Sequence, residues 1–282
     1  MEITIRKATP EDLPAAVIAE ESAMKGGAGY LNDVSPMFYA DTEGELMVAE
    51  VDQQVVAVAK YTIMPDHTAW LETLRVAPPY QRKGIGRRFY QRFVELSHEK
   101  KVPSMAMYTG VSNVPSASLA RVFGLDTAGV YREGSLKLEE AAAPNTLPNF
   151  VPVEPKRACE LLASLTEHWK GFLILNRTFF HMNDQVFTAL AKQGLVYEEP
   201  ESGSFMVLGN RFLEKRSLQI GIVGGDVQRC LDFAKAKGLK LGVPQLTIMF
   251  PPEDADLQAL LETNGYQMLA SDLQVMEGPT GA

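Results

Sequence analysis

The six residues Gln81 to Gly86, "QRKGIG", stand directly before a segment with helical periodicity. Gly84 and Gly86 have no Cβ atoms, so a ligand can approach the backbone closely at the predicted start of the helix. The first N–H groups of a helix have no partner within it, and the helix dipole favours negative charge there. The pattern is typical of a phosphate-binding loop. The bound group could be a nucleotide or another phosphate-bearing cofactor, or the loop could bind nothing.

The charge around this loop is a local exception. The chain has a formal net charge of −8, yet no Asp or Glu lies between Arg75 and Arg92, a stretch that holds six basic residues. Arg82, Lys83 and Arg87 could add charge-assisted hydrogen bonds to an anion. The alternative is that these long side chains only solvate an exposed helix face.

The spacing of the glycines argues against the two commonest nucleotide motifs. A P-loop requires G-x-x-x-x-G-K-[ST], which the chain lacks at this point. A dinucleotide fingerprint requires a third glycine at the position of Phe89, after the first strand of the domain. The ligand is therefore expected to be a different phosphate-bearing cofactor.

The elements around the loop predict an α/β domain with a mixed sheet. Thr9-Pro10-Glu11-Asp12 is typical of a helix start, with Thr9 as the cap, and this helix is expected to run to about Met24. Alternation and periodicity predict strands at 2–7, 46–51, 54–64, 69–76, 102–109 and 129–138, and helices at 87–98 and 116–123. Asp52-Gln53 is a tight-turn candidate between two of these strands.

The second half of the chain repeats part of this order. The Ala- and Pro-rich stretch 139–155 has the composition of a linker. Beyond it, strand and helix patterns mirror the first half at a period of about 140 residues, a spacing typical of duplicated units. The sequence therefore predicts a first domain at 1–140, a linker at 141–155 and a second domain at 156–282.

Gln81-x-x-Gly84-x-Gly86, after a strand ending at Val76, resembles the acyl-CoA signature of the GNAT (GCN5-related N-acetyltransferase) superfamily. "SNVPSASLARVFGL" resembles the later family motif in which an Asn, here Asn113, opens a helix. The resemblance covers about 3–138. The second half is similar to the same fold with its loop degraded to "GGDVQR". It implies two tandem acyl-CoA N-acyltransferase domains, the first catalytic and the second degenerate.

The resemblance implies acetyl-CoA as the cofactor, with no metal, and transfer of its acetyl group to a primary amine of a small molecule or peptide. The amine would attack directly in a ternary complex. The residues implied in binding coenzyme A, some through their main chain, are Leu74, Arg75, Val76, Gln81, Arg82, Lys83, Gly84, Ile85, Gly86, Arg87, Asn113 and Ser116.

Glu72 is the candidate general base. An amine must lose its proton before it attacks, and strand alternation would place Trp70, Glu72, Leu74 and Val76 on one face. A carboxylate on an otherwise apolar strand face is unusual. The alternative is a structural carboxylate that pairs with an arginine such as Arg75 or lies at the sheet edge.

The general acid is not where the family places it. Many members carry a Tyr seven residues after the Asn to protonate the leaving thiolate, and that position here is Ala120. Tyr108 and Tyr131 are candidate substitutes, against the commoner role of a tyrosine, which is to pack in the core. The missing Tyr also motivates a second hypothesis, a non-catalytic acyl-CoA-binding sensor or scaffold.

The acceptor is expected beside the first helix and the loop after it, where Tyr30, Asp33, Phe38 and Tyr39 could line a site. The acidic chain would steer a cationic amine towards it, although net charge can also reflect solubility alone. The second domain is expected to shape the acceptor cleft or a homodimer interface.

Composition excludes other classes. An acidic chain disfavours nucleic acid as a partner. The four histidines lack metal-ligand spacing, and two distant cysteines fit a reducing cytoplasm. No apolar run has the length of a membrane span.

Overall fold

The computed structural model describes residues 1–24, 29–139 and 148–281. It is a mixed α/β structure that divides into two compact units. Unit 1 consists of Met1–Thr109, Asn113–Ala128 and Met276–Ala282, and unit 2 of Gly110–Ser112 and Gly129–Val275. Two strands, β6 (Asp126–Lys137) and β15 (Leu273–Pro279), each contribute residues to both units.

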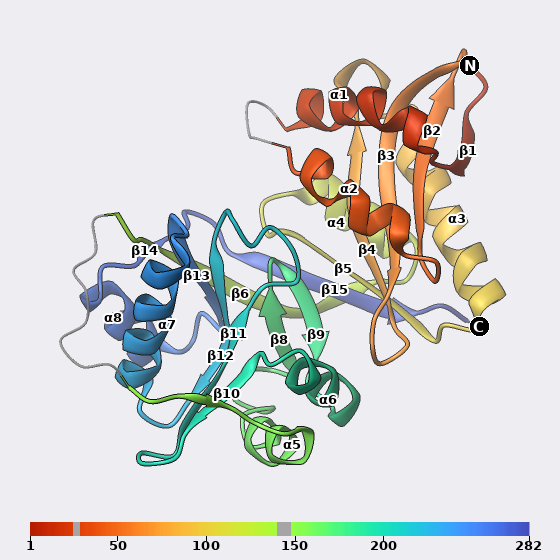
Figure 1. Ribbon diagram of the computed structural model, residues 1–282. Coiled ribbons are helices and arrows are strands. Elements are labelled where there is room, and N and C mark those ends of the chain that lie inside the picture. The colour runs from red at the N-terminus through yellow and green to blue at the C-terminus, as the bar shows by residue number, and fades with distance from the viewer. Residues whose placement is uncertain (25–28, 140–147, 282) are drawn as a thin grey trace. The chain divides into compact units, whose positions relative to one another are not determined.

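Unit 1 contains the predicted first sheet and its helices (Figure 1). Its elements are β1 (Thr4–Lys7), α1 (Leu13–Ala23), α2 (Leu31–Ala40), β2 (Glu45–Val51), β3 (Gln54–Ile63), β4 (Ala69–Val76), α3 (Ile85–Lys100), β5 (Ser104–Gly110) and α4 (Val114–Val122). Strands β1 to β4 form an antiparallel meander, and β5 then pairs in parallel with β4. The predicted hairpin turn is present, because Asp52 and Gln53 both have positive φ, at 49° and 64°, as a tight two-residue turn requires.

Helices cover both faces of this sheet. On one face, Phe89 and Phe93 of α3 and Ala117 and Ala120 of α4 pack in a single apolar cluster with Leu71 of β4. On the other face, α1 lies against β3 and β4, and α2 lies against β2 (Figure 1). The two apolar interfaces hold β4 between them, so its side chains have a defined environment on each side.

The start of the first helix is close to its prediction. The backbone N–H of Thr9 donates to Asp12 Oδ2 at 2.8 Å, which is the expected capping contact, and Pro10–Asp12 forms a 3-10 turn before α1. The segment after α1 was expected to be a loop, and this is wrong from Leu31 onwards. Leu31–Ala40 forms α2 with Pro36 inside it, because burial of Leu31, Val34 and Phe38 on one side outweighs the helix penalty of the proline.

Unit 2 contains a second mixed sheet. Its remaining elements are β7 (Val151–Pro152), α5 (Pro155–Ala163), β8 (Phe172–Leu175), β9 (Thr178–His181), α6 (Asp184–Lys192), β10 (Val196–Glu199), β11 (Ser204–Gly209), β12 (Leu218–Gly224), α7 (Val227–Leu241), β13 (Gln245–Phe250), α8 (Ala255–Thr263) and β14 (Gln267–Met268). Of the predicted linker, residues 141–147 lie outside the described residues, and its next part includes β7. The sequence does not predict the short strands β8, β9 and β10, because four residues are too few to show a periodicity.

The two units share one succession of elements. In unit 1, β4 and β5 are parallel and joined by α3, with α4 after β5; in unit 2, β12 and β13 are parallel and joined by α7, with α8 after β13. A parallel pair joined by a crossover helix is a βαβ unit. The repetition predicted from the sequence is therefore present as a repeated βαβα arrangement.

The last residues of the chain complete unit 1. Thr280 donates its N–H to the Pro103 carbonyl at 3.0 Å and its hydroxyl to the Val102 carbonyl at 2.6 Å, while His98 Nε2 donates to the Thr280 carbonyl at 2.9 Å. Gly278 lies against Gly124 so closely that a Cβ atom would lie 1.9 Å from the Gly124 carbonyl oxygen. The end of α3 and the start of β5 thus depend on a segment more than 150 residues away in sequence.

Within the described ranges, no helix has the length and apolar character needed to cross a membrane. The same residues contain no cluster of three or more His, Cys, Asp or Glu side chains suited to hold a metal ion.

We expect Gly278→Ala to destabilise unit 1 selectively. The added methyl group would overlap a backbone oxygen, and overpacking of this kind costs roughly 1–3 kcal/mol. Each unit contains one of the two tryptophans, Trp70 and Trp169, so Trp70 fluorescence in a Trp169→Phe background reports on unit 1. Gly110→Ala is the control, since its Cβ would lie 3.9 Å from the nearest atom, Ser112 Oγ. Equal midpoints for both variants would contradict the expectation.

Candidate functional site

Strands β4 and β5 separate after a short paired region. Only Ala69 with Met105 and Trp70 with Ala106 are in register as a parallel pair. The rest of β4, from Leu71 to Val76, and of β5, from Met107 to Gly110, therefore face an opening in the sheet, which we call the β4–β5 opening. The N–H of Ala77 donates to Val56 on the β3 side, so the N–H and carbonyl of Val76 point into this opening.

A β-bulge in β4 lies beside the opening. Thr73 and Leu74 together oppose the single residue Ala59 of β3, and Thr73 has a φ of 61°, a left-handed conformation that costs free energy for a β-branched residue. Because of the extra residue, the alternation of the strand changes phase. The expectation that Trp70, Glu72, Leu74 and Val76 share a face is therefore wrong.

The bulge sorts the side chains of β4 onto two faces. Leu71, Leu74 and Val76 pack with the apolar cluster beneath α3. Thr73 and Arg75 face α1 and α2 instead, since Thr73 contacts Tyr30 and Arg75 contacts Met24. Glu72 lies on that same side, opposite Leu71.

The predicted catalytic residues lie together on the face towards α1 and α2. Glu72 is 7% exposed, and its carboxylate accepts a hydrogen bond from Thr62 Oγ1 at 2.6 Å. Tyr108 of β5 stacks on Trp70 of β4, with ring centroids 6.2 Å apart and planes 7° apart. The structure thus brings a nearly buried carboxylate and a partly buried phenol to the same face at the point where the strands separate.

Tyr30 joins this group through the bulge. Its hydroxyl lies 2.8 Å from Thr73 Oγ1, and its backbone N–H donates to the buried Glu20 carboxylate at 3.1 Å. Burial and the nearby Tyr108 and Glu72 raise the pKa of Tyr30, while Arg75 opposes the rise. Thr73 was missed from the sequence, because nothing in "LETLRV" indicates that a threonine adopts a left-handed backbone.

The other three residues expected at an acceptor site have different places. Phe38 is buried and lies under the ammonium of Lys60, 5.7 Å from its ring centroid. The Tyr39 hydroxyl donates to the Thr9 carbonyl at 2.8 Å, and Asp33 is exposed in the first turn of α2. Tyr30 thus differs from Phe38 and Tyr39 in that its side chain bonds the β4 bulge at Thr73.

The glycine loop forms the start of α3. Gly84 occupies the N-cap in a left-handed conformation with φ 88°, and no side chain caps the helix. The first N–H groups of α3 are therefore left to solvent or a ligand. Gln81 Nε2 donates to the Val76 carbonyl at 2.9 Å and so ties the loop to the end of β4.

The basic cluster divides into two parts. Arg92 bonds three carboxylates, Glu45, Glu95 and Glu99. The others at the helix start, namely Arg82, Lys83, Arg87 and Arg88, are exposed and form no ion pair with any described residue. An uncapped helix start therefore coincides with four uncompensated cations, which is the electrostatic setting that a pyrophosphate requires.

The helix after β5 begins at Asn113, as predicted. Its side-chain oxygen accepts the Ser116 N–H at 3.4 Å, so Asn113 is the N-cap of α4. Ala120, at the position of the expected tyrosine, is fully buried in the apolar cluster. Tyr131 is a packed tyrosine: its hydroxyl donates to the Trp169 carbonyl at 2.8 Å and its ring contacts Phe172 and Phe179.

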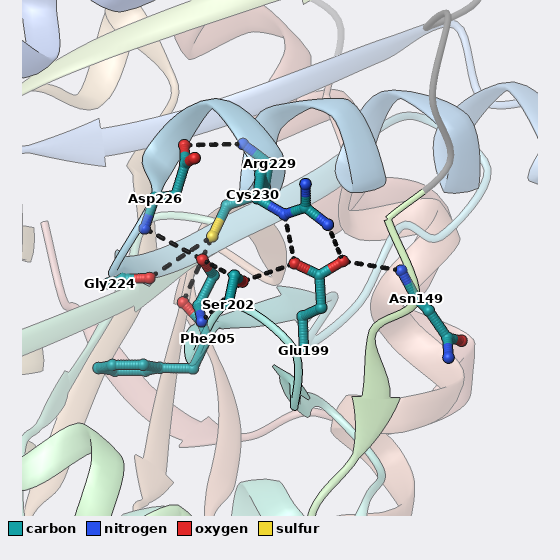
Figure 2. A network of polar contacts seen from close by, with 9 residues as sticks. Asn149, Glu199, Ser202, Phe205, Gly224, Asp226, Arg229 and Cys230 are labelled. Carbon is teal, nitrogen blue, oxygen red and sulfur yellow. Dashed lines mark hydrogen bonds and ion pairs between the residues drawn. The ribbon is translucent and has the colours of Figure 1, made fainter.

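The corresponding helix start in unit 2 has a different construction (Figure 2). Asp226 caps α7 by accepting the Arg229 N–H at 3.3 Å, and its own N–H donates to Ser204 Oγ at 3.0 Å. Arg229 forms a two-pronged ion pair with the buried Glu199. At the start of α7, the side chain of Asp226 accepts a backbone N–H, and Glu199 neutralises the nearby Arg229. These are the groups that a bound anion would otherwise contact.

A family model described as "Acetyltransferase (GNAT) family" matches residues 17–125, which span α1 to the end of α4. Residues 17–125 therefore match the GNAT family, and the remainder of the chain lies outside this match. This segment includes the bulge, the β4–β5 opening and the α3 loop, so the match falls on the site described above. Comparison with curated protein sequences finds no significant match.

Solved GNAT structures share the fold over the whole chain. A tandem GNAT protein from the clavulanic acid biosynthesis pathway has a TM-score of 0.65 at 13% identity, over 100% of this chain and 99% of its own. A GNAT protein from Sphaerobacter thermophilus has a TM-score of 0.66 at 14% identity, over 99% and 96%. A "putative acetyltransferase" from Pyrococcus horikoshii has a TM-score of 0.62 at 18% identity, over 98% and 89%. The prediction of two tandem GNAT-like domains is confirmed at the level of fold.

The GNAT site in unit 1 fits coenzyme A on its own geometry. A helix start with no capping side chain, exposed glycine backbone and four unpaired cations suit a pyrophosphate. The unpaired edge at Val76 offers an N–H to an extended amide-bearing arm, as in strand addition. The assignment of individual residues to cofactor binding stays a prediction for all twelve, namely Leu74, Arg75, Val76, Gln81, Arg82, Lys83, Gly84, Ile85, Gly86, Arg87, Asn113 and Ser116. The catalytic roles of Glu72 and Tyr108 and the division into a catalytic first and a degenerate second domain stay predictions too.

Glu199→Gln is expected to lower the stability of unit 2 in a pH-dependent way. Hydrogen bonds from Arg229 lower the pKa of Glu199 to about 2, so its contribution is complete above the ordinary carboxyl pKa and is lost as pH falls towards 2. We expect the melting temperature of the variant at pH 7 to be several degrees lower than that of the unmodified protein. This difference should shrink as the pH falls from about 5 to 2.5. Melting is followed by Trp169 fluorescence. Glu214→Gln, an exposed carboxylate in the same unit, is the control. A pH-independent difference would contradict the assigned ion pair.

Proposed function

We propose that unit 1 transfers the acetyl group of acetyl-CoA to a primary amine of a small molecule or peptide by direct attack in a ternary complex. The family and fold are those of N-acetyltransferases. The observation that carries the proposal is the juxtaposition at β4: an uncapped basic helix start follows the strand, and a nearly buried carboxylate lies on the strand beside its opening.

Acetyl-CoA supplies an acetyl thioester when bound. In this proposal, the first N–H groups of α3 and the side chains of Arg82, Lys83 and Arg87 bind the pyrophosphate. The Val76 N–H and the Asn113 side chain orient the pantetheine arm along the β4–β5 opening. These contacts place the reactive end of the cofactor beside the bulge.

Glu72 accepts the proton of the acceptor ammonium, directly or through one water. Most of an alkylamine is protonated at neutral pH, so removal of that proton is needed before attack. The Thr62 hydrogen bond fixes the carboxylate, and its low exposure removes competing water. Because Thr62 and Glu72 lie on adjacent strands, the base is held by the sheet rather than by a loop.

Tyr108 is the proposed donor of a proton to the departing sulfur. It lies on β5, two residues beyond the last residue paired with β4, and its stacking on Trp70 fixes the ring. Ala120 cannot act as the usual donor, and Tyr131 is engaged with the Trp169 carbonyl. Tyr108 is the predicted substitute on the same face of the sheet as Glu72.

A second candidate function is an acyl-CoA-binding sensor or scaffold without turnover. The buried alanine at position 120 favours it, since that methyl group cannot supply a proton. A panel of primary amines and peptides, assayed for acetyl-CoA-dependent release of thiol, separates the two. Binding of acetyl-CoA without acetylation of any acceptor would favour the sensor.

Acetyl-CoA is expected to raise the melting temperature of unit 1. A ligand at 100 times its Kd stabilises by about 2.7 kcal/mol, which thermal-shift measurement resolves readily. Gly86→Asp should abolish the shift, because its carboxylate would lie in the first turn of α3. Gly86→Ala is the matched control: it adds the same Cβ, 2.9 Å from Leu119 Cδ2, without charge. No shift for the unmodified protein at millimolar acetyl-CoA would refute cofactor binding.

Glu72→Gln should preserve the acetyl-CoA shift and reduce kcat by roughly 10²–10⁴, the usual contribution of a general base. The acidic limb of the kcat/KM profile should disappear, because the group that must be ionised is gone. Glu21→Gln, an exposed carboxylate on α1, is the control. An unchanged pH profile in Glu72→Gln would reject this residue as the base.

A further inference from the structure

Arg75 is a half-buried arginine with weak partners. Its Nε donates to the thioether sulfur of Met24 at 3.2 Å and its Nη1 to the Leu74 carbonyl at 3.0 Å. A thioether is a poor acceptor, and neither partner carries charge. Among the described residues, no carboxylate forms an ion pair with this guanidinium.

The other half-buried arginines of the chain show how unusual this is. Five of them bond a carboxylate, and these are Arg6, Arg92, Arg132, Arg177 and Arg229. A sixth, Arg211, donates to the Thr178 hydroxyl at 2.8 Å. Partial burial of a cation costs solvation free energy, and these sites recover it from an oxygen acceptor. Arg75 has one oxygen acceptor, the Leu74 carbonyl, but no carboxylate partner among the described residues.

The side chain of Arg75 points away from the phosphate-binding loop. Leu74 and Val76, its neighbours in sequence, pack on the α3 face, whereas Arg75 contacts Met24 at the end of α1. It shares this face with Glu72 and Thr73, and its charge reaches the Tyr30 hydroxyl, where it opposes the rise in the pKa. Its side chain therefore belongs to the acceptor side of β4, although the sequence assigned Arg75 to the cofactor.

We propose that Arg75 binds a carboxylate carried by the acceptor amine, so that the acceptor is an amino acid or a short amino-acid-like molecule. The inference rests on the proposed acetyl transfer, with the amine directed to Glu72. Glu72 and Arg75 are three residues apart, which limits their separation along the strand to about 10 Å. One carboxylate and one guanidinium on the same face complement the two charges of a zwitterion.

A carboxylate suits the site better than a phosphate does. A dianionic phosphate would meet one arginine and the negative Glu72, leaving net repulsion. A monoanionic carboxylate can form a bidentate pair with the guanidinium. Glu72 then remains free to interact with the ammonium group of the acceptor.

The test uses pairs of acceptors of equal length: ω-amino acids from glycine to 6-aminohexanoate, and the alkylamines that lack only the carboxylate. We measure kcat/KM by thiol release at saturating acetyl-CoA for the full chain and for Arg75→Gln. We expect the unmodified protein to prefer the amino acid of the best-fitting pair at least tenfold. Arg75→Gln should erase that preference by slowing the amino acid at least tenfold more than the alkylamine, and it should keep the acetyl-CoA thermal shift.

Two further variants sharpen the result. Arg75→Lys keeps the charge but loses the two-pronged geometry, so part of the preference should return. Arg121→Gln removes an exposed arginine of α4 and should behave as the unmodified protein. The same acceptors are added to protein saturated with acetyl-CoA in thermal-shift measurements, which report on binding even without turnover.

The outcomes separate this inference from the proposed function. If Arg75→Gln slows amino acids and alkylamines equally, or reduces the acetyl-CoA shift, Arg75 serves the fold or the cofactor and the inference is wrong while acetyl transfer stands. If the unmodified protein acetylates no amine, the proposed function fails. In that case an Arg75-dependent thermal shift with amino acids still supports the carboxylate site, and its absence overturns it.

Discussion

The bulge at Thr73 is the constraint on which the arrangement of unit 1 depends. One extra residue in β4, held in a left-handed conformation, changes the phase of the strand in its middle. Before the bulge, Leu71 packs beneath α3; after it, Leu74 and Val76 do the same. Without the extra residue, either Leu71 or the pair Leu74 and Val76 would face α1, and the apolar cluster would lose part of its contacts.

The same change of phase produces the polar face. Glu72, Thr73 and Arg75 all point towards α1 and α2, which a regular strand could not achieve with three residues at these spacings. The strain at Thr73 is offset by its hydrogen bond to Tyr30 and by the burial on both sides of β4. β4 and β5 have already separated where the bulge occurs, so backbone groups of β4 remain unpaired beside this polar face.

The two units show how one arrangement of elements can have opposite electrostatics. In unit 1 the helix after the strand starts at a glycine with basic neighbours, and the helix dipole is left uncompensated. In unit 2 the equivalent helix starts at Asp226, with Glu199 nearby and bonded to Arg229. When a carboxylate of the chain caps a helix, it occupies a free N–H group and reduces the positive potential there. Both of these features would otherwise attract a phosphate. The difference lies in a few side chains, since the βαβ geometry is common to both.

The sequence by itself determined the local features: the hairpin at Asp52-Gln53, the glycine-rich start of α3 and the Asn113 cap of α4. Each depends on neighbouring residues, whose conformational preferences are written into the sequence. Only the tertiary structure decided the faces of β4, the helix at Leu31–Ala40 and the contact of Tyr30 with Thr73. A left-handed threonine and a helix that contains a proline oppose local preference, and they exist because burial against distant residues outweighs it. The tertiary structure also decided the position of Arg75. The sequence grouped this residue with the cofactor loop, but the bulge in β4 places its side chain on the face towards α1.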